Sequence, residues 1–169
     1  NWHQSYYWDP CAFGGHVSCE EHAYVPNSDD DAYVHNATHI TRLYLSSWRL
    51  KGVVPPSFSS LTHLTHIAFG ESQLEGPMPD LSNMTGLIDL WLENNKLTGP
   101  APALHYSHLG VNPSNKCIGD YANDDAEHNP TCCGIGGTNR WDCPLPAGAI
   151  GCNHGGKLGY AVVCAGQMG

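Results

Sequence analysis

The chain has 169 residues, of which 41% are hydrophobic and 14% charged, and its formal net charge is -9 at pH 7. This length predicts a single domain with a sizeable core, or at most two small ones. The negative charge, with basic residues scattered singly, disfavours nucleic acid and anionic membrane surfaces as partners. No apolar run approaches the length that spans a membrane, so membrane insertion is not expected.

The cysteines fall into two groups, with none between Cys19 and Cys117. Their spacings lack the repeated short pairs of a zinc site, so disulfide bonds at both ends of a secreted protein are the preferred interpretation. The predicted disulfide cysteines are Cys11, Cys19, Cys117, Cys132, Cys133, Cys143, Cys152 and Cys164.

Two further features favour an extracellular protein. The chain begins with Asn1 rather than Met, which fits removal of a secretory signal, although trimming elsewhere would look the same. Two acceptor motifs for N-linked glycans begin at Asn36 and Asn83. We therefore expect a secreted, extracellular glycoprotein.

Residues 1–39 contain the first two cysteines, several aromatic residues near the start and an acidic stretch. The aromatic residues are interpreted as the core of a cap rather than as an exposed strip. The acidic segment SDDD, residues 28–31, is interpreted as a solvated turn in preference to a calcium site. The sequence predicts an N-terminal cap with an acidic loop over 1–39, ahead of a repeated region at 40–119.

Three consecutive segments, which start at Ile40, Leu64 and Leu87, repeat one pattern. One such segment cannot bury its own apolar face, whereas stacked copies form a continuous core. The pattern therefore predicts a solenoid whose short strands pair with those of the neighbouring coils. The aligned columns are Leu43, Ile67, Leu90; Leu45, Phe69, Leu92; Leu50, Leu74, Leu97; Gly52, Gly76, Gly99; Pro55, Pro79, Pro102; and Phe58, Leu81, Leu104.

A degraded fourth copy follows. The segment HLGVNPSNKCIG, residues 108–119, matches DLWLENNKLTG with one residue inserted, which places Cys117 where Leu97 stands in the third copy. We predict three full coils and a partial fourth. The parallel sheet is predicted to run through residues near 43–45, 67–69, 90–92 and 109–111.

The repeated pattern L-x-x-L-x-L-x-x-N-x-L-x-G-x-x-P closely resembles the plant-type leucine-rich repeat, and WDPCAFGGHVSC resembles the amino-terminal cap of those proteins. The resemblance implies an α/β-type, right-handed solenoid with a parallel β-sheet on its concave face, few regular helices and disulfide-stapled caps. It also implies that Cys11 pairs with Cys19, and that the pattern's asparagine, Asn95 in the third coil, bonds to the backbone inside the turn. Ser72 can imitate that asparagine in part and Trp48 cannot, so the first coil is expected to be irregular.

Residues 120–169 are predicted to form a cysteine-rich C-terminal cap. The segment NRWDCPLP, residues 139–146, looks like another coil fragment, and GKLGYAVVC, residues 156–164, is interpreted as a closing strand. The six cysteines from Cys117 onward are expected to pair among themselves, and their connectivity stays open. Adjacent Cys132 and Cys133 are expected to have different partners.

The repeat register predicts which side chains face the concave surface, because residues between the core leucines point away from the core. The three columns are Arg42, His66, Asp89, His108; Tyr44, Ala68, Trp91, Gly110; and Ser46, Gly70, Glu93, Asn112. Aromatic rings supply contact area and carboxylates supply orientation, which favours a ligand patch over an idle wet face. The predicted ligand-binding residues are Arg42, Tyr44, His66, Asp89, Trp91, Glu93 and His108.

Three further expectations concern this patch. Trp91 is expected to be an exposed anchor with open space on both sides, where small residues flank it in its column. The histidines predict that binding changes between about pH 5 and 7. A metal site at His66, Asp89 and His108 is disfavoured, because charged ladders on sheet faces usually only pair. We expect no cofactor.

No catalytic motif is present in the sequence, so no enzymatic activity is expected. The preferred function is secreted, non-enzymatic recognition of a protein, peptide or glycan through the concave face. Two alternatives stay open. One is a structural protein that self-associates head to tail through the solenoid ends into an extracellular filament or sheath. The other is an inhibitor of a cell-wall glycosidase, because polygalacturonase-inhibiting proteins share the repeat and the cysteine caps.

Overall fold

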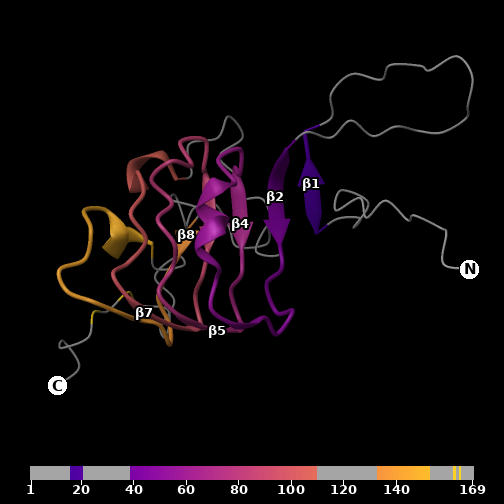
Figure 1. The fold of residues 1–169 in the computed structure, drawn as a ribbon. Helices are drawn as coiled ribbons and strands as arrows, with labels where there is room; N and C mark the ends of the chain where they lie inside the picture. The colour runs from indigo at the N-terminus through magenta and orange to yellow at the C-terminus, as the bar shows by residue number, and fades with distance from the viewer. Residues whose placement is uncertain (1–15, 21–38, 110–132, 153–161, 163, 165–169) are drawn as a thin grey trace, which may run out of the picture.

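The computed structural model describes residues 16–20, 39–109, 133–152, 162 and 164. These residues form a stack of coils, with β1 at one end and the segment around residues 133–152 at the other (Figure 1). The chain is thus a leucine-rich-repeat solenoid, as the pattern predicted. The helical elements of this part of the chain are three short 3-10 turns, η2 (Pro56–Ser60), η3 (Tyr106–His108) and η4 (Ala149–Gly151). None of the helices in the described segments is long and apolar enough to cross a membrane.

The first sheet contains one strand from each coil and one from the N-terminal segment. Its strand order is β1-β2-β4-β6-β8, in which β1 pairs with β2 in antiparallel fashion and all later pairs are parallel. The strands are β1 (Val17–Cys19), β2 (Ile40–Tyr44), β4 (His66–Ala68), β6 (Asp89–Trp91) and β8 (Cys133–Gly134).

The register of the first three coils is confirmed. Leu43 pairs with Ile67, and Ile67 pairs with Leu90, so the predicted column stacks in adjacent strands. Ile67 and Leu90 have no exposed surface, whereas Leu43 in the first coil retains 9%. This column anchors the core beneath the first sheet.

The fourth strand is not where the sequence placed it. Leu90 pairs with Cys133 and Trp91 with Gly134, so β8 supplies the fourth strand in place of residues 109–111. Leu109 instead follows the 3-10 turn η3 as a buried residue, and residues 110 and 111 lie outside the described ranges. The prediction was wrong because it relied on the spacing of apolar residues, which segment 108–119 shares with the repeats. Residues 133–141 are the ones that pair with β6 and bury apolar side chains against the third coil.

Residues 133–141 complete a coil because they provide its apolar and amide groups. Ile135 and Trp141 have no exposed surface, and the indole Nε1 of Trp141 donates to the backbone oxygen of Ile135 at 2.7 Å. Asn139, also buried, takes the position of the repeat's asparagine, since it accepts from the amide of Leu97 at 3.1 Å. The interpretation of NRWDCPLP as a coil fragment is confirmed by these contacts.

The second sheet lies on the other side of the coils. Its four parallel strands are β3 (Lys51–Gly52), β5 (Gln73–Gly76), β7 (Lys96–Gly99) and β9 (Arg140–Trp141). The first three end in glycines with φ of 87°, 73° and 79°. Glycine adopts this left-handed conformation without the steric penalty of a Cβ, which explains the glycine column of the repeat.

The first coil is irregular, as expected. Ser47, Glu71 and Asn94 take equivalent positions in three coils, and all have a positive φ, but only the first coil adds a second such residue, Arg49 with φ 56°. Trp48 stands where Asn95 stands in the third coil, and its side chain is 48% exposed. An indole cannot replace the backbone hydrogen bonds of a buried amide.

Two disulfide bonds lie in the C-terminal segment, Cys133–Cys152 and Cys143–Cys164. Both agree with the expectation that the cysteines of this segment pair among themselves. Cys19 is also disulfide-bonded. Its predicted partner Cys11 lies outside the described residues, as do Cys117 and Cys132.

Candidate functional site

The predicted concave columns are in register over three coils. Arg42 pairs with His66 and His66 with Asp89, and the next column aligns Tyr44, Ala68 and Trp91. His108 does not continue the first column, because it lies in η3 rather than in a strand of the sheet. Its placement beside His66 and Asp89 is therefore wrong. Gly110 and Asn112 are outside the described part of the chain.

Trp91 is not the exposed ring that the sequence suggested. Its side chain is 1% exposed, and it forms a buried cluster with Tyr44 and Ala68. Gly134 lies directly against the ring, because a Cβ at Gly134 would come within 3.0 Å of Cε3 of Trp91 and 2.6 Å of Oε2 of Glu93. The expected open space beside Trp91 is thus filled on this side. Trp91 is a packing residue rather than an accessible anchor.

The polar members of the columns are buried as well. His66, Asp89 and Glu93 are 3%, 2% and 0% exposed. Thr41 and Arg42, by contrast, are only half-buried. Among the predicted ligand-binding residues whose side chains the structure describes, Arg42 is thus the one that combines a charge with access to solvent.

Burial determines the protonation of His66. Desolvation, followed by the nearby positive charge of Arg42, lowers the pKa of His66 from 6.5 to about 4. Its Nδ1 lies 2.7 Å from the hydroxyl of Thr65, while Nε2 has no hydrogen-bond partner within the described segments. His66 is therefore neutral at pH 5 to 7 and does not provide the charge change that the sequence suggested for this range.

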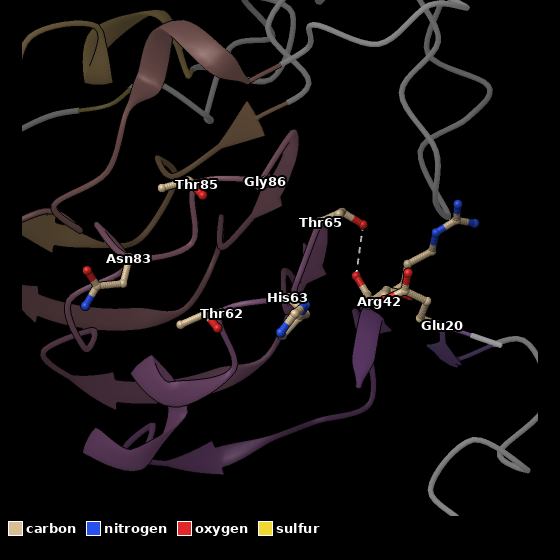
Figure 2. Close-up of a pocket in the computed structure, with 9 residues that line it drawn as sticks. Glu20, Arg42, Thr62, His63, Thr65, Asn83, Thr85 and Gly86 are labelled. Atoms are coloured by element: carbon tan, nitrogen blue, oxygen red, sulfur yellow. Dashed lines mark hydrogen bonds between the residues drawn. The ribbon is translucent and has the colours of Figure 1, made fainter. Parts of the chain in front are cut away.

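An open pocket of about 780 Å³ lies at the amino-terminal ends of the parallel strands β2, β4 and β6 (Figure 2). We call it the rim pocket. Its lining residues are Glu20, Thr41, Arg42, Thr62, His63, Thr65, Asn83, Thr85 and Gly86. Only Arg42 belongs to both this set and the predicted ligand patch.

The repeat itself builds the rim pocket. Thr41 and Thr65 occupy equivalent positions in the first two coils, and the amide of Thr65 donates to the carbonyl oxygen of Thr41 at 2.8 Å. The hydroxyl of Thr65 donates to the same oxygen at 3.0 Å, the bond drawn in Figure 2. Thr62 and Thr85 are likewise equivalent in consecutive coils. The sequence-based prediction rested on the leucine columns and did not include these residues. Their signal in the sequence is the recurrence of threonine at equivalent positions of consecutive repeats.

The lining of the rim pocket is suited to a polar ligand. Threonine hydroxyls donate and accept, and the guanidinium of Arg42 can hold a carboxylate through two parallel hydrogen bonds. Asn83, which begins a glycan acceptor motif, is exposed at the same pocket. Asn36, the other predicted glycan site, lies outside the described residues.

Comparison with known proteins finds similarity to plant receptor-like kinases. No family model matches the chain. Two probable LRR receptor-like serine/threonine-protein kinases of Arabidopsis thaliana are similar to it, one 34% identical over 70 residues and the other 37% identical over 67 residues. These matches cover 41% and 40% of this chain, and the chain spans only 7% of the length of each kinase.

A solved structure is also similar. It is the LRR ectodomain of the plant membrane receptor kinase GASSHO1/SCHENGEN3 from Arabidopsis thaliana, in complex with CASPARIAN STRIP INTEGRITY FACTOR 2. The similarity covers 89% of this chain and 20% of that chain, with a TM-score of 0.45 and 21% sequence identity.

Proposed function

Since this chain is a plant-type leucine-rich-repeat protein, we propose that it is a recognition module that binds a protein or peptide ligand at the rim pocket. The observation that carries the proposal is the pocket itself, which the half-buried Arg42 lines at one edge and which threonines of consecutive coils line elsewhere. The ligand contacts several coils at once, which makes binding depend on the intact solenoid.

The ligand group that fits this lining best is a carboxylate, from a peptide C-terminus or from an acidic side chain. The guanidinium of Arg42 would hold it, and the hydroxyls of Thr41 and Thr65, which already donate to the carbonyl oxygens of Ser18 and Thr41, would accept from backbone amides of the ligand. This revises the sequence-based hypothesis, which put the ligand on Trp91. A glycan is the other ligand class that hydroxyl-rich linings accept.

We propose that the module works outside the cell and has no enzymatic activity of its own. Two disulfides in the C-terminal segment support an oxidising compartment. The exposed acceptor Asn83 supports passage through a secretory pathway. The kinase activity in the names of the relatives is not transferred, because the match spans only 7% of each of them.

The test is a selection of peptides from a displayed random library against the purified protein. We expect the selected peptides to be enriched in carboxylates. Arg42→Glu should weaken their binding at least tenfold, since it replaces attraction with repulsion. Lys51→Glu, the same charge reversal on the exposed β3 of the same coil, should leave binding unchanged. Equal binding to wild type and Arg42→Glu would refute the assignment of the pocket.

A second candidate function is head-to-tail assembly into a filament or sheath. One observation favours it: the first coil exposes Trp48 and Val53, at 48% and 57%, and the C-terminal segment exposes Ile150, at 68%. Apolar groups towards both ends are what a repeating, non-closing contact needs. Sedimentation velocity over a concentration series tests it. Larger species that are lost in both Trp48→Ser and Ile150→Ser would support assembly, and a single monomeric species at every concentration would exclude it.

A further inference from the structure

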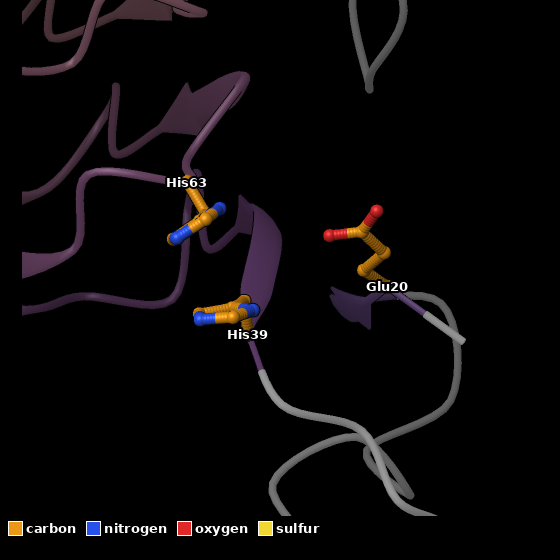
Figure 3. A group of neighbouring side chains, drawn as sticks. All are labelled: Glu20, His39 and His63. Carbon is orange, nitrogen blue, oxygen red and sulfur yellow. The ribbon is translucent and has the colours of Figure 1, made fainter. Parts of the chain in front are cut away.

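Three side chains that can ligate a metal converge beside the rim pocket. They are Glu20, His39 and His63, whose nearest ligand atoms all lie within 4.8 Å of one another (Figure 3). Glu20 and His63 are exposed, and His39 is half-buried. The rings of His39 and His63 stack with centroids 3.6 Å apart and an interplanar angle of 28°.

The backbone fixes this arrangement from three separate segments. Glu20 directly follows β1, and its amide donates to the carbonyl oxygen of His39 at 3.0 Å. His39 and His63 occupy equivalent positions in consecutive coils, and each stands two residues before a threonine of the pair Thr41 and Thr65. The backbone hydrogen bond between these two threonines holds the two coils together at this point. The main chain therefore holds the three residues on adjacent rungs, and only their side chains need to adjust.

We propose that Glu20, His39 and His63 bind a divalent transition-metal ion of the zinc type. Two imidazole nitrogens and one carboxylate oxygen form a ligand set that zinc accepts, with the fourth position left for water or a ligand. Imidazole disfavours calcium and magnesium, which take oxygen ligands. This cluster differs from the combination of His66, Asp89 and His108 considered from the sequence.

The adjustment that binding requires is small. Ligands about 2.0–2.1 Å from a tetrahedral zinc ion lie roughly 3.3 Å apart. The three groups must therefore approach one another by an ångström or two, and Glu20 and His63 can do so by rotation of exposed side chains. Because the imidazole lone pair lies in the plane of the ring, binding of one ion by both histidines also requires the two stacked rings to rotate relative to each other.

The position of the cluster suggests what the ion does. Glu20 and His63 line the rim pocket. An ion that neutralises Glu20 would leave a net positive charge in the pocket wall, next to Arg42. That charge would favour an anionic ligand. The metal site itself does not depend on the proposed ligand.

The experiment is isothermal titration of the untagged protein with zinc chloride, because a polyhistidine tag would bind the metal. Eleven histidines are present in the chain, so a matched control is needed. We expect one site that His63→Ala weakens at least thirtyfold and Glu20→Gln about tenfold, while His105→Ala, which removes another exposed histidine, leaves it unchanged. Circular dichroism of each variant establishes that the fold is retained.

A spectroscopic measurement decides the geometry independently of affinity. Cobalt(II) in place of zinc should give the intense visible absorption of a four-coordinate site in wild type and in His105→Ala, and lose it in His63→Ala. Binding of zinc with the same affinity and stoichiometry in folded His63→Ala would overturn the proposal. So would a cobalt spectrum that stays that of the hydrated ion.

Discussion

Asn95 and Asn139 donate through their side-chain amides to the same backbone oxygen, that of Leu92, at 3.0 and 2.8 Å. Each also accepts through Oδ1 from the coil before it, Asn95 from the amide of Leu74 at 2.9 Å and Asn139 from that of Leu97 at 3.1 Å. Buried backbone groups that would lack partners in the turn are satisfied in this way. The two asparagines thus join the third and fourth coils, which are separated by a long segment of sequence.

Asn95→Ala should destabilise the protein by about 3 kcal/mol, because it removes the partners of several buried backbone groups at once. Denaturation with urea measures the free energy of unfolding. Asn83→Ala, which removes an exposed amide in the same coil stack, should change it by less than about 0.5 kcal/mol. Similar values for the two variants would contradict the role assigned to the buried amide.

Trp91→Ala should lower the free energy of unfolding by about 3–5 kcal/mol, as expected for a large aromatic side chain removed from a packed site. The exposed Trp48 provides the matched control, and Trp48→Ala should cost less than half as much. Thermal and urea denaturation of both variants check this. An exposed anchor, as expected from the sequence, would contribute little to stability, so an unchanged melting temperature of Trp91→Ala would restore that interpretation.

His66 should make the protein less stable as the pH falls from about 6.5 to about 4. The pKa of His66 is near 4 in the folded chain and 6.5 otherwise, so between these values the unfolded chain binds a proton that the folded chain resists. Burial is the main cause, and the charge of Arg42 adds to it. The loss is on the order of 2 kcal/mol, after allowance for solvent screening of Arg42.

The stability of His66→Asn should accordingly fall less than that of wild type between pH 7 and pH 4.5. Urea denaturation at both pH values measures the fall in the free energy of unfolding for each protein. The other histidines are common to both proteins, so their contributions cancel when the two falls are subtracted. If His66→Asn retains the wild-type dependence, His66 titrates normally and is not buried as described.

Asn83 should carry an N-linked glycan when the protein is made in a eukaryotic secretory pathway, because its motif is intact and its side chain is exposed. Peptide mass spectrometry before and after enzymatic deglycosylation measures the occupancy. Asn129-Pro130-Thr131, in which proline blocks the motif, is an internal negative control. Since Asn83 lines the rim pocket, Asn83→Gln should bind a large protein ligand more tightly than the glycosylated form does. An unmodified Asn83 in such material would contradict the accessibility of this acceptor site.

The leucine columns made the first three coils predictable, because side-chain spacing alone determines which residues a stacked coil can bury. Leu43, Ile67 and Leu90 align as the sequence indicated. The fourth coil was not predictable in the same way, since the segment 108–119 repeats the spacing and Cys133 begins a coil after an insertion. Asn139, followed two residues later by the apolar Trp141, was the available signal.

The candidate site was less predictable than the fold. Strand alternation correctly placed Trp91 on the face opposite the leucines, but alternation does not report what else covers that face. The rim pocket depends on turn residues that precede the strands, and Glu20 reaches it through an antiparallel strand that the repeat pattern does not contain. Long-range pairing of this kind has no periodic signature in the sequence.

Hydrogen–deuterium exchange with and without a selected peptide tests the central claim most directly, which is that ligands bind at the rim pocket. The account predicts protection of amides in residues 39–42, 62–66 and 83–86, with no change in the strands of the second sheet. The same peptide should give no protection in Arg42→Glu. Protection confined to the second sheet, or to the C-terminal segment 133–152, would contradict it.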